Sequence, residues 1–268
     1  MIPTFGFGGF VPVDSPVHAL DARCKLVAVV VAMVVVFWLG SFATLGILVA
    51  MVLVAGWGSR IGFFFLFRPL RSIWFLLLLA FLFSLFSGQG RVLLRWGPFL
   101  LYEQGLVRGL LYVLRLVAVV LVSTLFSATT SPVRIADGLE WMMNHVGFRR
   151  SFSHETAMIL SLAIRFVPVI TAEAQHLVDA QRSRGAAFDS GRLLQRLKAF
   201  LPVLVPLLLG TFQRAEELAL AMDVRGYRGV EGRVKFFQPK AQRRDGFFLV
   251  GVLGFFTGLL LLDRFLFT

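Results

Sequence analysis

The sequence predicts an all-α polytopic membrane protein with about five transmembrane helices and a further helical domain in the cytoplasm. Hydrophobic residues make up 57% of the 268 residues, and the mean hydropathy is +0.80, whereas a soluble domain is about 45–50% apolar. The excess lies in long runs such as residues 73–86, as is typical of membrane-spanning helices. The formal charge of +12 agrees with retention of Lys and Arg on the cytoplasmic side.

The first apolar run, residues 26–57, is too long for one span. As a single helix it would measure about 48 Å, whereas the hydrocarbon core of a bilayer is about 30 Å thick. Basic residues flank the run on both sides, at Arg23 and Arg60, so an even number of spans lies between them. We therefore predict two spans that meet at an outer turn at Gly40-Ser41, with Asp21 capping the first helix.

The third predicted span ends at Phe86. It begins at Phe64 or at Ile73, because Arg68-Pro69 interrupts the run and proline breaks helices. An outer loop over residues 91–104 follows.

The fourth predicted span covers residues 106–126, and the fifth covers residues 247–262. The fourth carries Arg115, which we expect to face the interior of the helix bundle, because a charged side chain that faces lipid is costly. With the N-terminus inside, four spans return the chain to the cytoplasm, and the C-terminus lies outside.

Between the fourth and fifth spans the apolar residues recur at helical spacing, which indicates amphipathic helices and not spans. One should begin at Ser131-Pro132 and end at Gly147, and the next should begin at Ser153-His154-Glu155. The predicted domains are therefore an N-terminal membrane part over residues 1–128, a cytoplasmic helical domain over residues 129–245, and a C-terminal span over residues 246–268.

A short pattern, Ala-x-x-x-Arg-Gly, occurs twice in the cytoplasmic block, at residues 180–185 and 221–226. Each copy follows a helix-favouring segment, and its glycine stands where a helix would stop. The repetition predicts a paired partner-binding surface at two helix ends. The alternative is two arginines that only complement their own helix dipoles and bond the final carbonyl groups of their helices. The predicted surface consists of Ala180, Ser183, Arg184, Gly185, Ala221, Val224, Arg225 and Gly226.

No catalytic or cofactor-binding pattern is apparent in the sequence. The segment from His154 to Met158 lacks the second histidine of a zinc protease helix, and neither a nucleophile elbow nor a phosphate-binding loop occurs. The single cysteine, Cys24, excludes an internal disulfide. We expect no catalytic residue, no metal and no cofactor in this chain, and we attribute its basic charge to cytoplasmic retention and not to nucleic-acid binding.

Several segments taken together resemble the transmembrane T component of energy-coupling factor transporters, which are bacterial and archaeal ATP-driven importers of vitamins and metal ions. The two Arg-Gly motifs carry the resemblance first, and the other segments are residues 18–26, 164–168, 202–206 and 214–227. The family usually has proline where this chain has Ala22, a departure that touches only the entry into the first span.

The resemblance implies an energy-coupling subunit of the cytoplasmic (inner) membrane. Arg184 and Arg225 would sit in the grooves of two ABC ATPase subunits, identical or different, which carry out ATP hydrolysis. The cytoplasmic helices of residues 129–245 would form the coupling domain. A separate substrate-binding S component would bind the membrane helices and the coupling helices, so this chain would not determine which substrate is imported.

The residues alone leave other classes open. A conventional ABC permease would form its own substrate path and bind substrate unaided. An intramembrane enzyme would need a convergent polar site, and a scaffold would recover no ATPase in a pull-down.

Overall fold

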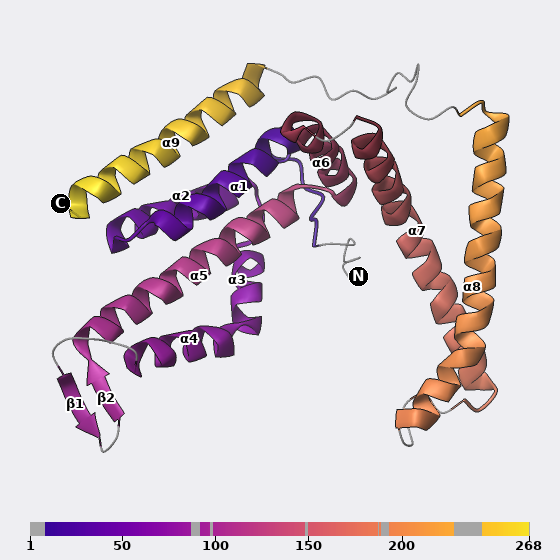
Figure 1. Ribbon diagram of the computed structural model, residues 1–268, viewed down its shortest axis with the longest axis horizontal. Helices are drawn as coiled ribbons and strands as arrows, with labels where there is room; N and C mark the ends of the chain where they lie inside the picture. The colour runs from indigo at the N-terminus through magenta and orange to yellow at the C-terminus, as the bar shows by residue number, and fades with distance from the viewer. Residues whose placement is uncertain are drawn as a thin grey trace. The chain divides into compact units, whose positions relative to one another are not determined.

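The computed structural model describes residues 9–86, 92–96, 99–147, 150–186, 188, 193–227 and 243–267 (Figure 1). The predicted all-α class is confirmed, with one addition, a two-stranded antiparallel hairpin. The helices are α1 (Ala22–Trp38), α2 (Phe42–Gly58), α3 (Phe63–Ser72), α4 (Trp74–Phe86), α5 (Glu103–Thr129), α6 (Pro132–Val146), α7 (Arg150–Ser183), α8 (Leu193–Val224) and α9 (Arg243–Phe267), and the strands are β1 (Val92–Trp96) and β2 (Phe99–Tyr102).

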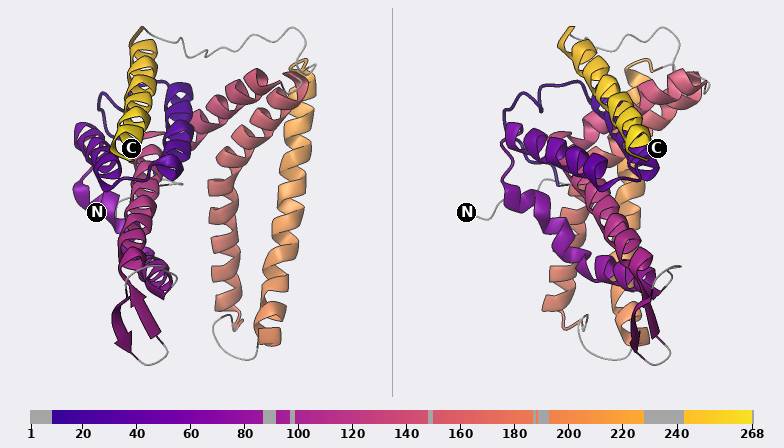
Figure 2. Two further views of the ribbon diagram at one scale, coloured as in Figure 1. Left: turned by 60° about the vertical axis from the view of Figure 1, so that its left-hand side comes forward. Right: turned by 90° about the vertical axis from the view of Figure 1, so that its left-hand side faces the viewer.

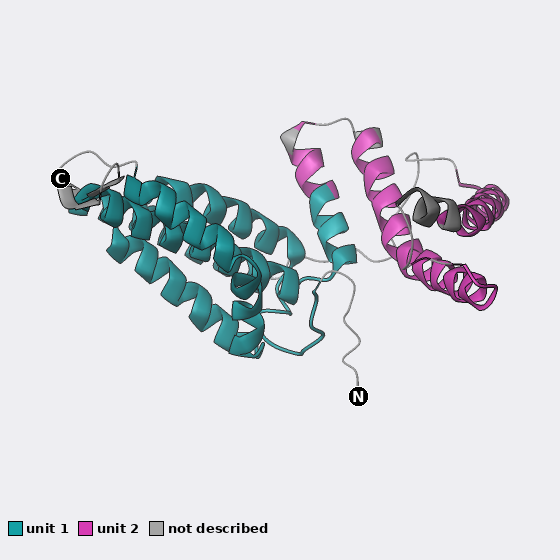
Figure 3. Ribbon diagram, turned by 90° about the horizontal axis from the view of Figure 1, so that it is seen from below, with its two compact units in different colours: residues 1–139, 237–268 teal, residues 140–236 magenta. Residues whose placement is uncertain are grey.

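The chain divides into two compact units (Figure 3). Unit 1 comprises Met1–Leu139 and Phe237–Thr268, and unit 2 comprises Glu140–Phe236. Within unit 1, α1, α2, α5 and α9 share one hydrophobic core, and α4 packs along α5. The most deeply buried members of this core are Val36, Leu39, Leu45, Leu66, Ala118, Leu121 and Ala128.

The predicted division of the first apolar run is confirmed. The chain leaves α1 at Leu39, and α2 begins after Ser41, whose hydroxyl oxygen accepts a hydrogen bond from Ala43 N at 3.4 Å. Asp21 caps α1 as predicted, because its carboxylate accepts a hydrogen bond from Arg23 N at 3.0 Å. Length and capping chemistry therefore suffice to place both helices.

Two aspartates near the ends of α9 bind backbone groups of the first helical pair. Asp245 accepts a hydrogen bond from Asp21 N at 3.0 Å, at the start of α1. Asp263 accepts hydrogen bonds from Gly40 N and Ser41 N, each at 3.0 Å, between α1 and α2. The C-terminal helix is thus fixed in register along α1 at both of its ends.

The third predicted span is a bent pair of helices. Pro69 lies inside α3, and the helix ends at Ser72, so that α3 and α4 meet at an angle of 59°. The outer loop predicted over residues 91–104 instead contains β1 and β2, in which Trp96 pairs with Phe99 and Val92 with Tyr102.

By length and composition, three helices of the described part of the chain are able to cross a membrane: α5, α7 over Phe152–Ser183, and α9. The bent pair of α3 and α4 would add a fourth span, and α2 is a shorter apolar helix. These helices fit a polytopic membrane protein. The sequence analysis assigned α7 to the cytoplasm, and that assignment stays a prediction, as do the predicted domain boundaries.

Arg115 faces the interior of unit 1 as predicted. Its guanidinium group donates a hydrogen bond to the carbonyl oxygen of Leu39 at 2.7 Å. This contact satisfies one of the carbonyl groups left free at the end of α1.

Unit 2 contains the hairpin of α7 and α8, which run antiparallel (Figures 1 and 2). The preceding helix, α6, begins at Pro132 and is followed by Gly147, as predicted. The predicted start of α7 at Ser153 is wrong, because the helix already begins at Arg150. Ser153 is fully buried and His154 bonds to Glu140, so these residues pack against neighbours and do not cap the helix.

Candidate functional site

The two Arg-Gly turns end α7 and α8 with the same backbone geometry. At the first turn, Ala186 N donates to Gln181 O at 3.0 Å and Gly185 N donates to Arg182 O at 2.9 Å. Such a pair of bonds, one spanning six residues and one spanning four, is a Schellman motif. It satisfies carbonyl groups that the helix end leaves free.

The second turn repeats the motif. Tyr227 N donates to Met222 O at 3.0 Å, and Gly226 N donates to Asp223 O at 2.9 Å. The two glycines have φ angles of +86° at Gly185 and +70° at Gly226, a region that residues with a side chain seldom adopt. The predicted glycine turns at the ends of both helices are confirmed.

The arginine of each turn is exposed to solvent. Within the described ranges, neither the Arg184 nor the Arg225 side chain makes a hydrogen bond, an ion pair or a ring contact. At both helix ends the carbonyl oxygens instead accept hydrogen bonds from backbone N–H groups. The alternative reading, in which each arginine satisfies its own helix end through hydrogen bonds, therefore finds no contact in its favour.

The other predicted surface residues are exposed as well. Ala180 and Ala221 stand one turn before the arginines, and Val224 is 88% exposed, which is unusual for a branched apolar side chain. The residues of each copy lie together at one helix end. The two copies lie at opposite ends of the hairpin (Figures 1 and 2), so they form two separate surfaces.

Two contacts within unit 2 escaped the sequence analysis. The Arg182 guanidinium lies over the Phe188 ring, 6.0 Å from its centroid, and Phe188 packs against Phe200 with ring centroids 5.0 Å apart. Arg182, two residues before Arg184, thus packs against another residue of unit 2. No short motif signals this contact, because Phe188 is an isolated aromatic residue.

The second missed contact joins α7 to α8. Arg214 Nη1 lies 2.6 Å from Glu173 Oε2, and the two side chains are 34% and 31% exposed. The two atoms do not form a hydrogen bond, so the contact is an ion pair. The sequence analysis did not pair Glu173 with any residue of α8.

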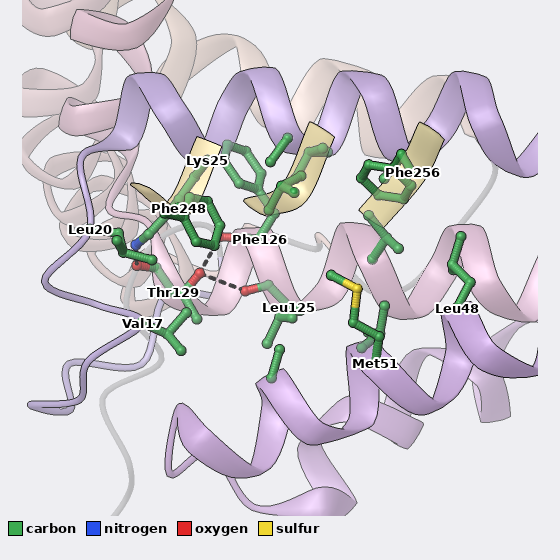
Figure 4. Close-up of a pocket in the computed structure, with 17 residues that line it drawn as sticks. Val17, Leu20, Lys25, Leu48, Met51, Leu125, Phe126, Thr129, Phe248 and Phe256 are labelled. Atoms are coloured by element: carbon green, nitrogen blue, oxygen red, sulfur yellow. Dashed lines mark hydrogen bonds between the residues drawn. The ribbon is translucent and has the colours of Figure 1, made fainter. Parts of the chain in front are cut away.

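An apolar pocket of about 140 Å³ lies in unit 1 between α1, α2, α5 and α9 (Figure 4). Lys25 closes one end, where its ammonium group donates to Thr129 O at 3.0 Å. Most of the remaining lining is hydrocarbon, as Leu48, Met51 and Phe256 illustrate. This pocket has no set of converging polar groups with which to bind a hydrophilic substrate.

Comparison with known proteins yields one consistent family. Residues 14–236 match the CbiQ family, described as a cobalt transport protein. The chain is similar to the energy-coupling factor transporter transmembrane protein EcfT of Heliobacterium modesticaldum, with 36% identity over 257 residues, 96% of each chain. It is also similar to the proteins of that name from Bacillus subtilis (38% over 237 residues, 88% of this chain and 89% of the relative) and Brevibacillus brevis (35% over 247 residues, 92% and 93%).

Proposed function

We propose, since the chain belongs to the CbiQ family and is an energy-coupling transmembrane component of energy-coupling factor transporters, that it links two ABC ATPase subunits to a separate substrate-binding membrane subunit. In this proposal ATP-driven closure of the ATPases moves α7 and α8, and their motion reorients the substrate-binding subunit. The imported substrates are vitamins or metal ions, and the location is the cytoplasmic membrane of a bacterium or archaeon.

One observation carries the proposal. Two helices end in the same Schellman motif, and each presents an exposed arginine that the described part of the chain does not use. A repeated arginine without an internal partner suits a partner protein that offers the same kind of acidic groove twice. Two ATPase subunits meet this requirement.

The residue types suit such a groove. Arginine offers a planar, permanently charged fork that binds carboxylates through two parallel hydrogen bonds. Ala180 and Ala221 keep the helix face beside each arginine narrow, so that a partner can approach closely. Truncating one partner of a desolvated, hydrogen-bonded charge pair costs about 2–5 kcal/mol, enough to release a docked subunit.

A separate membrane subunit is supported by the apolar surface of the coupling helices. One stretch of α8 exposes large apolar side chains, with Leu209 at 61% and Phe212 at 72% exposure. Contiguous apolar surface of this kind marks a protein or membrane contact. A substrate-binding membrane subunit would cover it, whereas a conventional permease with its own substrate path would need polar groups that the pocket of unit 1 does not offer.

The test is purification of the tagged full-length chain in mild detergent from its native membrane, followed by mass spectrometry of the bound chains. The proposal expects two ABC ATPase subunits and one small membrane subunit, with radiolabelled substrate retained by the complex and not by the chain alone. Substrate retention by the isolated chain would instead support a conventional permease, and recovery without any ATPase would remove the coupling role.

A further inference from the structure

We infer that the ion pair between Glu173 and Arg214 is a positioning pair that sets the separation and orientation of the two Arg-Gly turns. The inference rests on the proposed function, because it assigns the pair a purpose in docking two ATPase subunits at once. The described part of unit 2 gives two grounds for it, namely where the pair lies and how its residues are spaced from the turns.

The pair lies where α7 and α8 approach each other. A Cβ atom placed on Gly210 would lie 3.1 Å from Glu173 Oε1, so the glycine leaves room for the carboxylate against α8. Arg214, one turn further along α8, reaches the same carboxylate at 2.6 Å. Both residues of α8 therefore meet one side chain of α7, and the contact fixes the two helices relative to each other.

The spacing from the pair to the two turns is equal. Glu173 stands eleven residues before Arg184, and Arg214 stands eleven residues before Arg225. Eleven residues advance a helix by about 16 Å and by just over three full turns, so each member of the pair shares a helix face with its arginine. Because α7 and α8 run antiparallel (Figures 1 and 2), the turns lie on opposite sides of the pair at equal helical distances.

This arrangement suits a partner with two equivalent binding grooves. Each groove has to meet one turn, so the distance between the turns has to match the distance between the grooves. A side-chain contact at the middle of the hairpin controls that distance, because residues 173–184 of one helix and residues 214–225 of the other form segments of equal length between the contact and the two turns. Preorganising the turns in this way reduces the free energy that docking spends on ordering the hairpin.

A purely stabilising ion pair would have different consequences. At about one-third exposure the pair contributes little to unfolding stability, and its loss would leave the average distance between the helix ends unchanged. A positioning pair changes that distance even where the helices stay folded. The distance is therefore the decisive quantity, and it is measurable without any ATPase present.

The experiment places spin labels at Ser183→Cys and Val224→Cys in a Cys24→Ser background. Both positions are exposed, and each stands directly before the arginine of its helix. Double electron–electron resonance on the full-length chain in lipid nanodiscs then gives the distance between the two helix ends. We expect a narrow distribution in the parent, a broader one with a shifted mean in Glu173→Arg and in Arg214→Glu, and the parent distribution in the double exchange.

A second readout is recovery of ATPase subunits with the same variants without labels. Each single reversal should lower recovery about two- to fivefold, the range that a partly exposed ion pair can supply, and the exchange should restore it. Glu216→Gln is the matched control, since it neutralises an exposed carboxylate on α8 two residues from Arg214 and should change neither readout.

Unchanged distances in both single variants, or an exchange that fails to restore the parent distribution, would overturn the inference. That failure is separable from failure of the proposed function. If Arg184→Ala combined with Arg225→Ala still binds both ATPases, the docking role is wrong whatever the distances show. If this double variant releases the ATPases while the distances do not respond to Glu173, only the positioning role is wrong.

Discussion

Replacement of Asp263 by Asn should destabilise unit 1 far more than the small difference in shape between the two side chains suggests. Asp263 is 8% exposed and accepts three hydrogen bonds from the first helical pair. Their donors are Gly40 N and Ser41 N, each at 3.0 Å, and the Thr44 hydroxyl at 2.7 Å. One carboxylate thus holds the end of α9, the end of α1 and the start of α2.

The magnitude follows from the three bonds. Hydrogen bonds to a charged acceptor contribute about 1.5–3 kcal/mol each, and neutral ones contribute about 0.5–1.5 kcal/mol. Asn keeps one acceptor oxygen for Ser41 and Thr44 but turns an N–H group toward Gly40. A loss near 1 kcal/mol at each of the three bonds lowers the free energy of unfolding by about 3 kcal/mol.

The assay is thermal unfolding of the purified chain in detergent, followed by the loss of the monodisperse peak in size-exclusion chromatography. A change of about 3 kcal/mol corresponds to a fall in midpoint of about 6–12 °C for a unit of this size. The control is Asp179→Asn, which removes an exposed pair with Arg182 at 3.9 Å and should shift the midpoint little. Equal midpoints for the two variants would refute the reasoning.

Three further predictions concern other parts of the chain. Gly185→Ala and Gly226→Ala should each destabilise the turn at the helix end by about 1–2 kcal/mol, because both glycines have positive φ angles. Each Ala variant should recover less ATPase in a pull-down than the Asn variant at the same site. Recovery at the parental level with Ala would contradict this. Burial, and secondarily a nearby lysine, lower the pKa of His18, so the unfolded state takes up a proton before the folded state does. The unfolding midpoint should therefore fall as the pH drops below about 6.5, and His18→Gln should reduce this dependence of the midpoint on pH. An unchanged dependence in the variant would exclude His18 as its cause. Single cysteines at Ile159 and His176, both exposed on α7, should react with membrane-impermeant reagents only from the cytoplasmic side, and opposite sidedness of the two would show that α7 crosses the membrane.

Elements governed by local chemistry were predictable from the sequence. The split between α1 and α2 follows from bilayer thickness, and the ends of α6 follow from Pro132 and Gly147. The two Schellman turns follow from glycine at each helix end. In each of these cases the signal and the structure it determines lie within a few residues of each other.

Elements governed by tertiary contacts were not predictable. The Ser153-His154-Glu155 segment has the composition of a helix start, yet burial of Ser153 and the bond from His154 to Glu140 place it inside α7. The β1–β2 hairpin had a local signal, two apolar runs on either side of Gly97-Pro98, which the polar flanks of the loop obscured.

The pairing of Glu173 with Arg214 has no local signal at all. Forty-one residues separate the two side chains along the chain, and a single sequence does not reveal which of several exposed charges meet across a helix crossing. Only the equal spacing from each residue to its Arg-Gly turn hints at the pair, and that spacing gains meaning once α7 and α8 are seen to run antiparallel (Figure 1).

The measurement that tests the coupling role most directly is the ratio of ATPase subunits to this chain in a pull-down of Arg184→Ala combined with Arg225→Ala. If the arginines only complement their helix dipoles, each substitution costs about 0.3–1 kcal/mol of helix stability and docking is unaffected. If they occupy ATPase grooves, the double variant inserts into the membrane normally, but its ATPase ratio and its substrate uptake collapse. Each single variant then has an intermediate effect. Lys at either position rescues only in part, because it keeps the charge and loses the planar guanidinium fork. Full ATPase stoichiometry together with full uptake in the double variant would contradict the account.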